Sequence, residues 1–359
     1  MTPLSQNIVD QISTIEPPSE QGRQRARAHL DTLTKPLGSL GRLEDLAAQI
    51  VAIRGERITE PNNKGVYIFA ADHGITAEGV SAYPREVTHQ MVLNFLTGGA
   101  AINVLARLHK VALHVVDIGV DADFHGIPGL LHHKVARGTA NMLHAPAMTD
   151  AELTQALSIG SAIADSAAAS AQTMIAIGEM GIGNTTAASA ITCALTRATA
   201  SQATGRGTGV DSEAHKRKIR VVNAVIAKHF GESPTQPLPL DILRCVGGFE
   251  IAAITGMMLS AARHKLVVVV DGFISTAAAA LAVAIAPSVK GYLIAGHQSE
   301  EPGHELLLDH MSLTPVLTLN MRLGEGTGAV LAMPILDSAI ALYTQMATFT
   351  SAQVSEATQ

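Results

Sequence analysis

The stretch LVVVVDGFISTAAAALAVAIAP, residues 266–287, joins a run of β-branched residues to a long Ala-rich segment. Asp271 and Gly272 separate the two parts, and Pro287 ends the second because proline cannot continue a helix. The run is short enough for a strand, and the segment is long enough for a helix. A strand with apolar side chains at every position is typical of a parallel sheet that is buried on both faces.

The segment between Asp271 and Lys290 contains no charged residue, so its length alone would permit a membrane span. Alanine supplies little apolar surface, and the strand before the segment and the proline after it suit a folded α/β protein better. We therefore expect a helix buried inside a soluble protein, and we expect no membrane partner.

Short apolar runs with the same character recur along the chain, and long Ala-rich segments lie between most of them. These runs are Val66–Ala71, Val111–Val116, Thr173–Ile177, Leu266–Val270, Tyr292–Ala295 and Val316–Leu319. Alternation of strands with helices predicts the α/β fold class, with a parallel sheet flanked by helices on both faces.

The two chain ends differ from the middle. Residues 1–60 look helical, with breaks at Pro17-Pro18 and at residues 35–41, and residues 328–347 predict a helix before a polar tail. We expect residues 1–60 and 330–359 to pack together as a small helical domain beside an α/β domain of residues 61–329. The polar N-terminus lacks the basic and apolar regions of a signal peptide.

Composition argues against several classes of protein. The 359 residues carry a formal net charge of −6, only 16% of them are charged, and no basic stripe is present. Nucleic acid is therefore not an expected partner, because neutralising phosphates needs clustered Lys and Arg. Cys193 and Cys245 lie in apolar stretches and fit no metal-binding spacing, so we expect no metal, no cofactor and a cytoplasmic location.

Carboxylates, imidazoles and hydroxyls set among glycines follow the ends of the predicted strands. The segments are 72–74, 117–119, 178–186, 271–273, 296–299 and 322–328. Ligands of open parallel sheets bind beyond the carboxyl ends of the strands. The pattern therefore predicts an active site at one rim of the sheet.

Segment 178–186 is the best candidate for binding a phosphate. Gly181 and Gly183 permit close approach of the backbone, and Asn184, Thr185 and Thr186 can cap the helix that follows. The N–H groups and dipole at a helix N-terminus favour an anion. A capped helix without a ligand remains the alternative, because the pattern is neither a Walker loop nor a Rossmann fingerprint.

A second glycine-rich loop, residues 205–209, follows a predicted helix and leads to the cations Lys216, Arg217 and Lys218. As a dinucleotide-binding loop it is weak, because such loops follow a strand. A run of cations is usually a solvated face, but a lysine after a mobile glycine-rich loop can also clamp a phosphate.

Glu325 lies between Gly324 and Gly326, after an apolar run and before an apolar helix. Partial desolvation of such a carboxylate raises its pKa toward the value that a general base needs. The alternative is an acid favoured by the dipole of the following helix. Similar alternatives apply to two further residues. His73 either binds substrate or is a structural histidine, and Asp271 either binds substrate or caps the end of a strand.

The ordered set of motifs resembles the nicotinate-nucleotide–dimethylbenzimidazole phosphoribosyltransferase family. The matching segments are residues 35–44, 71–74, 83–88, 178–186, 205–209, 271–273, 296–297 and 322–326. Each glycine motif alone would be weak evidence, whereas the ordered set covers nearly the whole chain. The resemblance implies a Rossmann-like α/β domain, a smaller helical domain made from both chain ends, and a homodimer.

The resemblance also implies an activity, which is the transfer of the phosphoribosyl group of nicotinate mononucleotide to 5,6-dimethylbenzimidazole in the cobalamin pathway. It implies that Glu325 is the general base and that Glu179 lies near the nicotinate and the ribose. It places the phosphate around Gly181, Lys218 and Ser299. The benzimidazole is expected near Tyr83, Gln90, Met91, Met180 and Leu323. Further substrate-binding residues are expected at Gly183, Asn184, Thr185, Asp72, His73 and Asp271.

Three alternatives accompany this prediction. Tyr83 and Met91 depart from the more polar residues of some relatives, so another lower-ligand base is one alternative. A non-catalytic nucleotide-binding protein is the second, although it would have no reason to hold a carboxylate at position 325. A transferase that uses a pyrophosphate-activated sugar is disfavoured, because no second acid is adjacent to Asp271 and no Gly-Thr follows close behind it.

Overall fold

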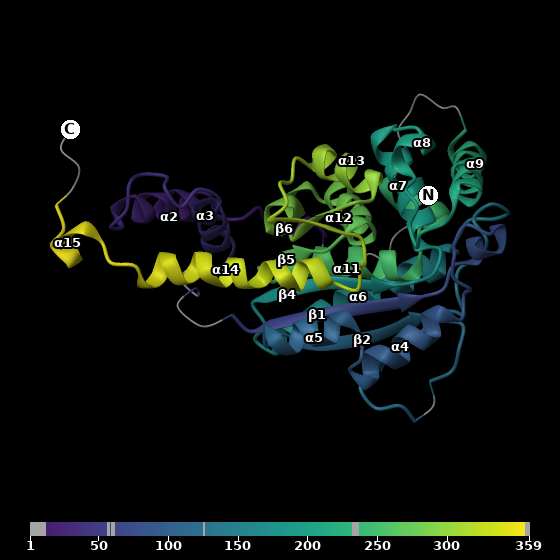
Figure 1. The fold of residues 1–359 in the computed structure, drawn as a ribbon, viewed down its shortest axis with the longest axis horizontal. Coiled ribbons are helices and arrows are strands. Elements are labelled where there is room, and N and C mark those ends of the chain that lie inside the picture. Colours follow the sequence, from purple (N-terminus) through teal and green to yellow (C-terminus); the bar gives the residue numbers. More distant parts are fainter. Residues whose placement is uncertain (1–11, 56–57, 59–61, 125, 232–236, 356–359) are drawn as a thin grey trace.

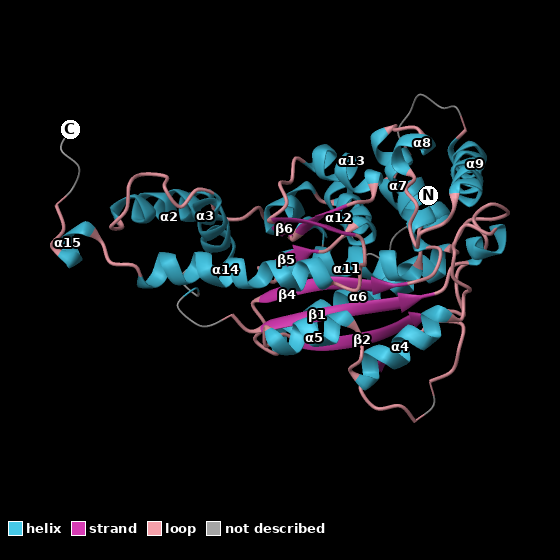
Figure 2. Ribbon diagram, viewed as in Figure 1, coloured by secondary structure: helices cyan, strands magenta, loops and turns pink. Residues whose placement is uncertain are grey.

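The computed structural model describes residues 12–55, 58, 62–124, 126–231 and 237–355. The polar residues 1–11, for which the sequence predicts no signal peptide, lie outside the described residues. The main sheet has six parallel strands in the order β3-β2-β1-β4-β5-β6 (Figures 1 and 2). The strands are β1 (Lys64–Ala71), β2 (Ala112–Gly119), β3 (Leu130–His132), β4 (Met174–Met180), β5 (Val267–Val270) and β6 (Leu293–Ala295). The predicted α/β fold class is confirmed.

The predicted run Val316–Leu319 does not belong to the main sheet. It belongs to β8 (Leu317–Met321), which pairs in parallel with β7 (His297–Ser299) as a separate two-stranded sheet. The side chains of β8 are largely exposed, whereas those of β5 are all buried. The prediction that this run joins the main sheet was therefore wrong, because four residues in a row do not reveal which strand they pair with.

Helices cover both faces of the main sheet (Figure 1). On one face, α11 (Phe249–Arg263) contacts β1, β2, β4 and β5, and it packs against α6 (Asp150–Ala169) and α12 (Phe273–Ile285). On the other face lie α4 (Val87–Thr97), α5 (Ala101–Leu108) and α14 (Thr327–Gln345). The remaining helices are α2 (Glu20–Thr32), α3 (Arg42–Arg54), η2 (Gly74–Glu78), α7 (Asn184–Thr196), α8 (Ala200–Ala203), α9 (Ser212–Phe230), α10 (Pro239–Val246), η3 (Pro287–Tyr292), α13 (Pro302–Met311) and α15 (Phe349–Ala352).

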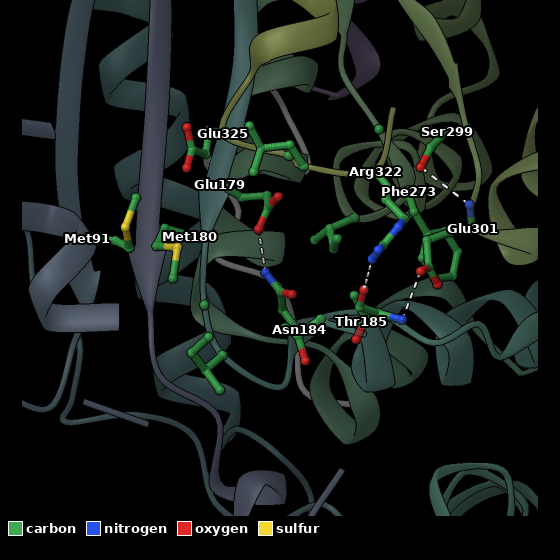
Figure 3. A pocket seen from close by; sticks show the side chains of 18 of the residues that line it. Met91, Glu179, Met180, Asn184, Thr185, Phe273, Ser299, Glu301, Arg322 and Glu325 are labelled. Carbon is green, nitrogen blue, oxygen red and sulfur yellow. Dashed lines mark hydrogen bonds between the residues drawn. The ribbon is translucent and has the colours of Figure 1, made fainter. Parts of the chain in front are cut away.

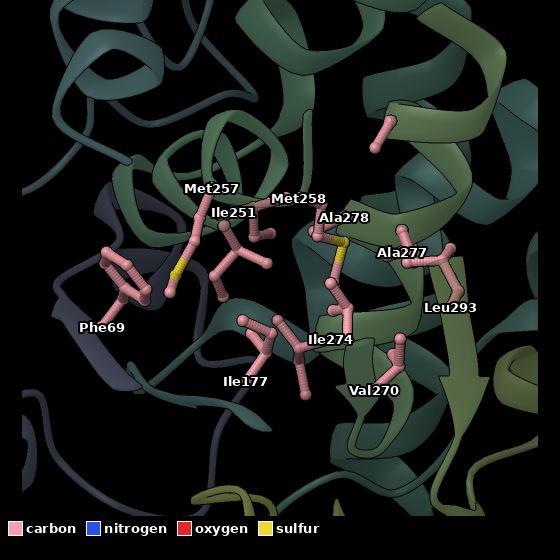
Figure 4. Packing of buried hydrophobic residues seen from close by; sticks show 14 of the residues in the cluster. Phe69, Ile177, Ile251, Met257, Met258, Val270, Ile274, Ala277, Ala278 and Leu293 are labelled. Carbon is pink, nitrogen blue, oxygen red and sulfur yellow. The ribbon is translucent and has the colours of Figure 1, made fainter. Parts of the chain in front are cut away.

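The Ala-rich segment after β5 is a helix buried inside the protein, as predicted. All residues of α12 from Phe273 to Ala282 are buried, and the helix ends just before Pro287. Figure 4 shows Ile274, Ala277 and Ala278 of this helix among the large side chains of α11 and the sheet. The small side chains of α12 let this helix lie close to its neighbours. The helices therefore pack densely, although each alanine buries little apolar surface.

Helices from the two chain ends meet at one end of the molecule. α2 packs on α3, and α3 packs against α14 (Figure 1). The ring of His29 hydrogen-bonds through Nε2 to the carbonyl oxygen of Tyr343 at 3.0 Å. Because α14 runs unbroken from Thr327 to Gln345, the predicted domain boundary at residue 330 falls inside one helix.

Within the described part of the chain, two segments have the length and apolar composition of a membrane span, namely Val87–Leu108 and Thr327–Gln345. The first consists of two helices, α4 and α5, because α4 ends at Gly98, whose φ of 83° lies in the left-handed region. The second is α14, which contacts β4, β5 and α3. Both segments therefore have packing partners inside the protein.

Candidate active site

A cavity of about 650 Å³ lies at the carboxyl ends of the strands, at the predicted rim (Figure 3). Its lining comes from β4 and the turn after it, the starts of α4, α7 and α12, the loop around Gly207, β7, and the turn before α14. Ten of the residues expected from the sequence line it. They are Tyr83, Met91, Glu179, Met180, Gly181, Asn184, Thr185, Ser299, Leu323 and Glu325.

One side of the cavity is apolar. Met91 and Met180 lie beside each other there in Figure 3, and Val87 completes this part of the wall. Tyr83 and Leu323 also line the cavity, and each is more than half exposed. Flexible thioether side chains adapt well to a flat ring, so this wall suits an aromatic base.

Glu325 lies beside the apolar wall and is only 6% exposed. The pKa of its carboxyl is raised to about 7, mainly because burial disfavours the charged form; a backbone hydrogen bond from Ile102 opposes this rise, and the negative charge of Asp271 adds to it. The Oε2 atom has no hydrogen-bond partner among the described residues. The side chain therefore offers a free oxygen with a pKa suited to accepting a proton near neutral pH.

A second carboxylate, Glu179, projects from β4 into the same cavity. Burial raises its pKa to about 8, and the charges of Asp271 and Glu250 contribute in the same direction. Its Oε2 accepts a hydrogen bond from Nδ2 of Asn184, at the start of α7. The sequence predicts that Glu179 follows a strand, but β4 extends past Ile177 to Met180, so this side chain is held by the sheet itself.

The turn that carries Glu325 has an uncommon backbone. Gly324, Glu325 and Gly326 have φ angles of 84°, 64° and 86°, all in the left-handed region. For a residue with a side chain this region costs about 1–2 kcal/mol. Gly178 of β4 lies directly beneath the turn, where a Cβ atom would be only 2.5 Å from the carbonyl oxygen of Glu325.

The opposite side of the cavity in Figure 3 carries the polar side chains of Thr185, Ser299, Glu301 and Arg322, with the ring of Phe273 among them. Lys218 of α9 reaches this side from behind and donates a hydrogen bond from Nζ to Oγ1 of Thr185 at 2.7 Å. Burial lowers the pKa of Lys218 to about 8, against the opposing charge of Glu301. Hydroxyls, a helix N-terminus and a buried lysine are the groups that bind phosphate.

The glycine-rich loop 205–209 crosses from the polar side toward Tyr83. The N–H of Gly207 donates to Oε1 of Glu301 at 2.8 Å, and its carbonyl oxygen accepts a hydrogen bond from Nη1 of Arg322 at 3.0 Å. Oγ1 of Thr208 accepts the N–H of Ala82 at 3.0 Å. The loop is therefore attached to both sides of the cavity.

Glu301, Arg322 and Thr208 were not among the predicted site residues. Glu301 directly precedes Pro302 and α13, so in the sequence it has the features of an acid at a helix N-terminus. The motif 322–328 includes Arg322, but its role depends on Gly207, which lies more than a hundred residues earlier. No local pattern signals such a contact.

Six of the expected residues do not line the cavity. Gln90 is exposed on α4, and Gly183 begins α7 behind Gly181. Asp72 accepts the N–H of Asp121 at 2.8 Å and lies 3.5 Å from Nε of Arg85. His73 pairs through Nε2 with Oε1 of Glu250 at 2.6 Å. Lys218 and Asp271 lie just behind the lining. The ion pair of His73 with Glu250 corresponds to the alternative of a structural histidine.

Comparisons with known proteins place the chain among transferases. The family model described as Phosphoribosyltransferase matches residues 15–354. A nicotinate-nucleotide–dimethylbenzimidazole phosphoribosyltransferase from Geobacter sulfurreducens is 48% identical over 349 residues, which cover 97% of this chain and 98% of that protein. One from Chloroflexus aurantiacus is 49% identical over 356 residues, which cover 98% and 99%. The crystal structure of CobT from Thermus thermophilus has a TM-score of 0.89 and 46% sequence identity, and the match covers 94% of this chain and all of that one.

Proposed function

Since the chain belongs to the nicotinate-nucleotide–dimethylbenzimidazole phosphoribosyltransferase family, as its motifs predict, we propose that it transfers the 5-phosphoribosyl group of nicotinate mononucleotide to 5,6-dimethylbenzimidazole. The products are α-ribazole 5'-phosphate and nicotinate, and the former supplies the lower ligand of cobalamin. One observation carries the proposal: Glu325, a buried carboxylate with a raised pKa and a free oxygen, lines a cavity that is apolar on one side and carries polar side chains on the other.

We assign the apolar wall to the benzimidazole and the polar side to the nucleotide. The methyl groups and ring of the base contact Met91, Met180 and Leu323, with Tyr83 at the rim and Gln90 farther out. The 5'-phosphate binds near Gly181, Thr185 and Ser299, with Lys218 supplying the charge. Glu179 and Asn184 lie between the two sides, where the ribose and nicotinate are held. Gly183, Asp72, His73 and Asp271 support these groups from behind.

The reaction needs little activation of the leaving group. The ring nitrogen of nicotinate in the mononucleotide is a pyridinium, so it departs with the electron pair of its bond to C1'. The lone pair of one benzimidazole nitrogen forms the new bond to C1' from the opposite face, which converts a β-riboside to an α-riboside. Glu325 takes the proton from the other nitrogen. A positioned base contributes roughly 10²–10⁴ in rate, and alignment of the two rings contributes more.

The assay is direct. Purified protein is incubated with nicotinate mononucleotide and dimethylbenzimidazole, and release of nicotinate and formation of α-ribazole 5'-phosphate are followed by chromatography. Binding of the nucleotide without release of nicotinate would favour the non-catalytic alternative. Faster turnover with a purine or a phenolic than with dimethylbenzimidazole would favour a different lower-ligand base.

We expect full activity without added divalent metal and in the presence of a chelator. A pyridinium leaving group needs no Lewis acid, and the chemistry described above uses only protein groups. The test compares turnover in EDTA with turnover in magnesium. Loss of turnover in EDTA that magnesium restores would contradict a transfer that uses protein groups alone.

Activity should depend on pH through Glu325. This carboxyl accepts a proton only after losing its own, and its pKa is raised to about 7. The value of kcat/KM for dimethylbenzimidazole should therefore rise with pH and level off above about pH 8, because kcat/KM reports ionisations of the enzyme before that base binds. A profile that stays level down to about pH 5.5 would contradict proton removal by a group with a raised pKa.

We further propose that the enzyme is a cytoplasmic homodimer without nucleic-acid or membrane partners. The two cysteines are buried free thiols, which suits a reducing compartment. Leu37 and Leu108 are 75% and 68% exposed, so apolar surface is available for a second copy. Residues 1–60 and 330–359 are proposed as a small helical domain, and residues 61–329 as the Rossmann-like catalytic domain. Analytical ultracentrifugation measures the oligomeric state.

A further inference from the structure

The turn that carries Glu325 is held by a residue from another strand. Asp271 directly follows β5, and its Oδ2 accepts the N–H of Gly326 at 3.1 Å while its Oδ1 accepts the N–H of Ala329 at 3.0 Å. The N–H of Gly326 belongs to the peptide that begins at Glu325. One carboxylate thus binds the peptide next to Glu325 and the first turn of α14 at the same time.

Asp271 itself is not available to a ligand. It is 1% exposed, it does not line the cavity, and both of its oxygens accept backbone hydrogen bonds. In addition, Nε2 of His297 lies 3.6 Å from Oδ1 of Asp271. The carboxylate is enclosed by protein groups, so the substrate-binding role expected from the sequence has no geometric support.

The backbone of the turn needs such an anchor. Glu325 has a left-handed conformation, which a residue with a side chain adopts only when its surroundings compensate for the strain. Burial raises the pKa of the Asp271 carboxyl, and His297 and the N–H groups of Gly326 and Ala329 oppose this rise because they stabilise its charged form. Hydrogen bonds to that charged form are stronger than those to a neutral acceptor. A helix N-terminus also favours a negative charge, so Asp271 stabilises the start of α14 as well.

We propose that Asp271 is a positioning residue for Glu325: by holding the N–H groups of Gly326 and Ala329, it fixes the left-handed turn that directs the Glu325 carboxylate into the cavity. This role rests on the proposed function, because it concerns the same reaction. Its structural basis is the contact between the end of β5 and the start of α14.

The test is a double-mutant cycle with Asp271→Asn and Glu325→Gln. Asparagine keeps the size of the side chain, but its amide nitrogen cannot accept a backbone N–H, so one anchor is lost. In the parent background we expect kcat to fall on the order of 10–10²-fold, as for a small misplacement of a catalytic group, with the KM for nicotinate mononucleotide nearly unchanged. In the Glu325→Gln background the same change should cost less than about threefold, because residues that act as a unit are not additive. An equal loss in both backgrounds would show that Asp271 does not act through Glu325.

Glu250→Gln is the matched control. Glu250 is also a fully buried carboxylate near the cavity. It lies on α11, on the opposite face of the sheet from α14, and it pairs with His73 instead of the turn before α14. Its replacement should lower kcat by the same factor in both backgrounds. If Glu250→Gln showed the same non-additivity, the effect would come from removing any buried charge, and the assignment to Asp271 would be withdrawn.

A pH profile supplies a second readout. The negative charge of Asp271 raises the pKa of Glu325, so Asp271→Asn should move the acidic limb of kcat/KM to lower pH. The other titratable groups that face this pair are Glu179 from β4 and His297 from β7, and both remain in the variant, as does Glu250 from α11, whose charge acts on Glu179. An acidic limb that does not move would contradict close placement of Asp271 and Glu325.

Hydrogen exchange measures the anchor without relying on activity. The peptide that covers residues 324–330 should exchange at least about tenfold faster in Asp271→Asn and at the parent rate in Glu250→Gln. If the parent protein had no transferase activity but Asp271→Asn still exchanged faster, the proposed function would be refuted and the anchor would remain supported. Unchanged exchange refutes the anchor whatever the activity. If Asp271→Asn does not fold, Asp271→Ser, which buries no amide, is measured in the same way.

Discussion

Replacing Glu325 with glutamine should lower kcat by roughly 10²–10⁴-fold, which is about 3–5 kcal/mol of barrier. Glutamine keeps the size of the side chain and can still hydrogen-bond, so folding and substrate binding should survive. It cannot accept the benzimidazole proton, so the loss should appear in turnover far more than in the Michaelis constants. The measurement is steady-state release of nicotinate at saturating concentrations of both substrates.

An N-methylated benzimidazole is the control substrate for this variant. It has no proton to lose, so its turnover should be much less sensitive to Glu325→Gln wherever it binds. If the variant turns over dimethylbenzimidazole within a few-fold of the parent, and chemistry limits both enzymes, Glu325 is not the base. Glu179, which has a raised pKa and lines the same cavity, is then the next carboxylate to replace.

Replacing Lys218 with alanine should weaken binding of nicotinate mononucleotide roughly ten- to a hundred-fold, because a charge-assisted contact to phosphate is typically worth about 1.5–3 kcal/mol. Binding of the benzimidazole should change little, since the lysine approaches from the polar side of the cavity. Lys218 is 1% exposed, so removing it leaves a void as well as a missing charge. Lys218→Met, which fills the space without the charge, separates the two effects.

Lys216→Ala provides the matched control. This lysine lies two residues earlier on α9, but it is exposed and pairs with Glu213 at 2.9 Å. It should leave the Michaelis constant for the nucleotide unchanged. In the parent, that constant should increase above about pH 8, where Lys218 loses its proton, and Lys218→Met should lack this increase. An unchanged Michaelis constant in Lys218→Ala would assign this lysine to a structural role.

Much of the architecture could be predicted because it depends on local patterns. Val267–Val270 is apolar at every position, and such a run has few stable places other than the middle of a covered sheet. The position of the cavity followed from the same reasoning, because polar residues at the ends of parallel strands must share one rim. Glu325 was singled out because a carboxylate between two glycines, after an apolar run and before an apolar helix, should be partly desolvated, and the family resemblance then gave it the role of the base.

What could not be predicted depends on contacts across the chain. The hydrogen bonds from Gly207 to Glu301 and from Arg322 to Gly207 join segments about a hundred residues apart, and none of these residues belongs to a pattern that signals a partner. His73 and Glu250 are a further case, because nothing near either residue reveals that the other will pair with it. The sequence also singled out Asp271, but only its hydrogen bonds to Gly326 and Ala329 distinguish a residue that binds substrate from one that holds the turn before α14.

The unbroken course of α14 gives the molecule a mechanical property. Its 19 residues, with Pro334 in the interior, correspond to a helix about 28 Å long, which starts two positions after Glu325 and ends beside the helices of the N-terminal segment. The two ends of a continuous helix move together, whereas a flexible linker would let them move independently. The contact of α14 with α3 and the turn that carries Glu325 are therefore joined by one helix, with no loop between them.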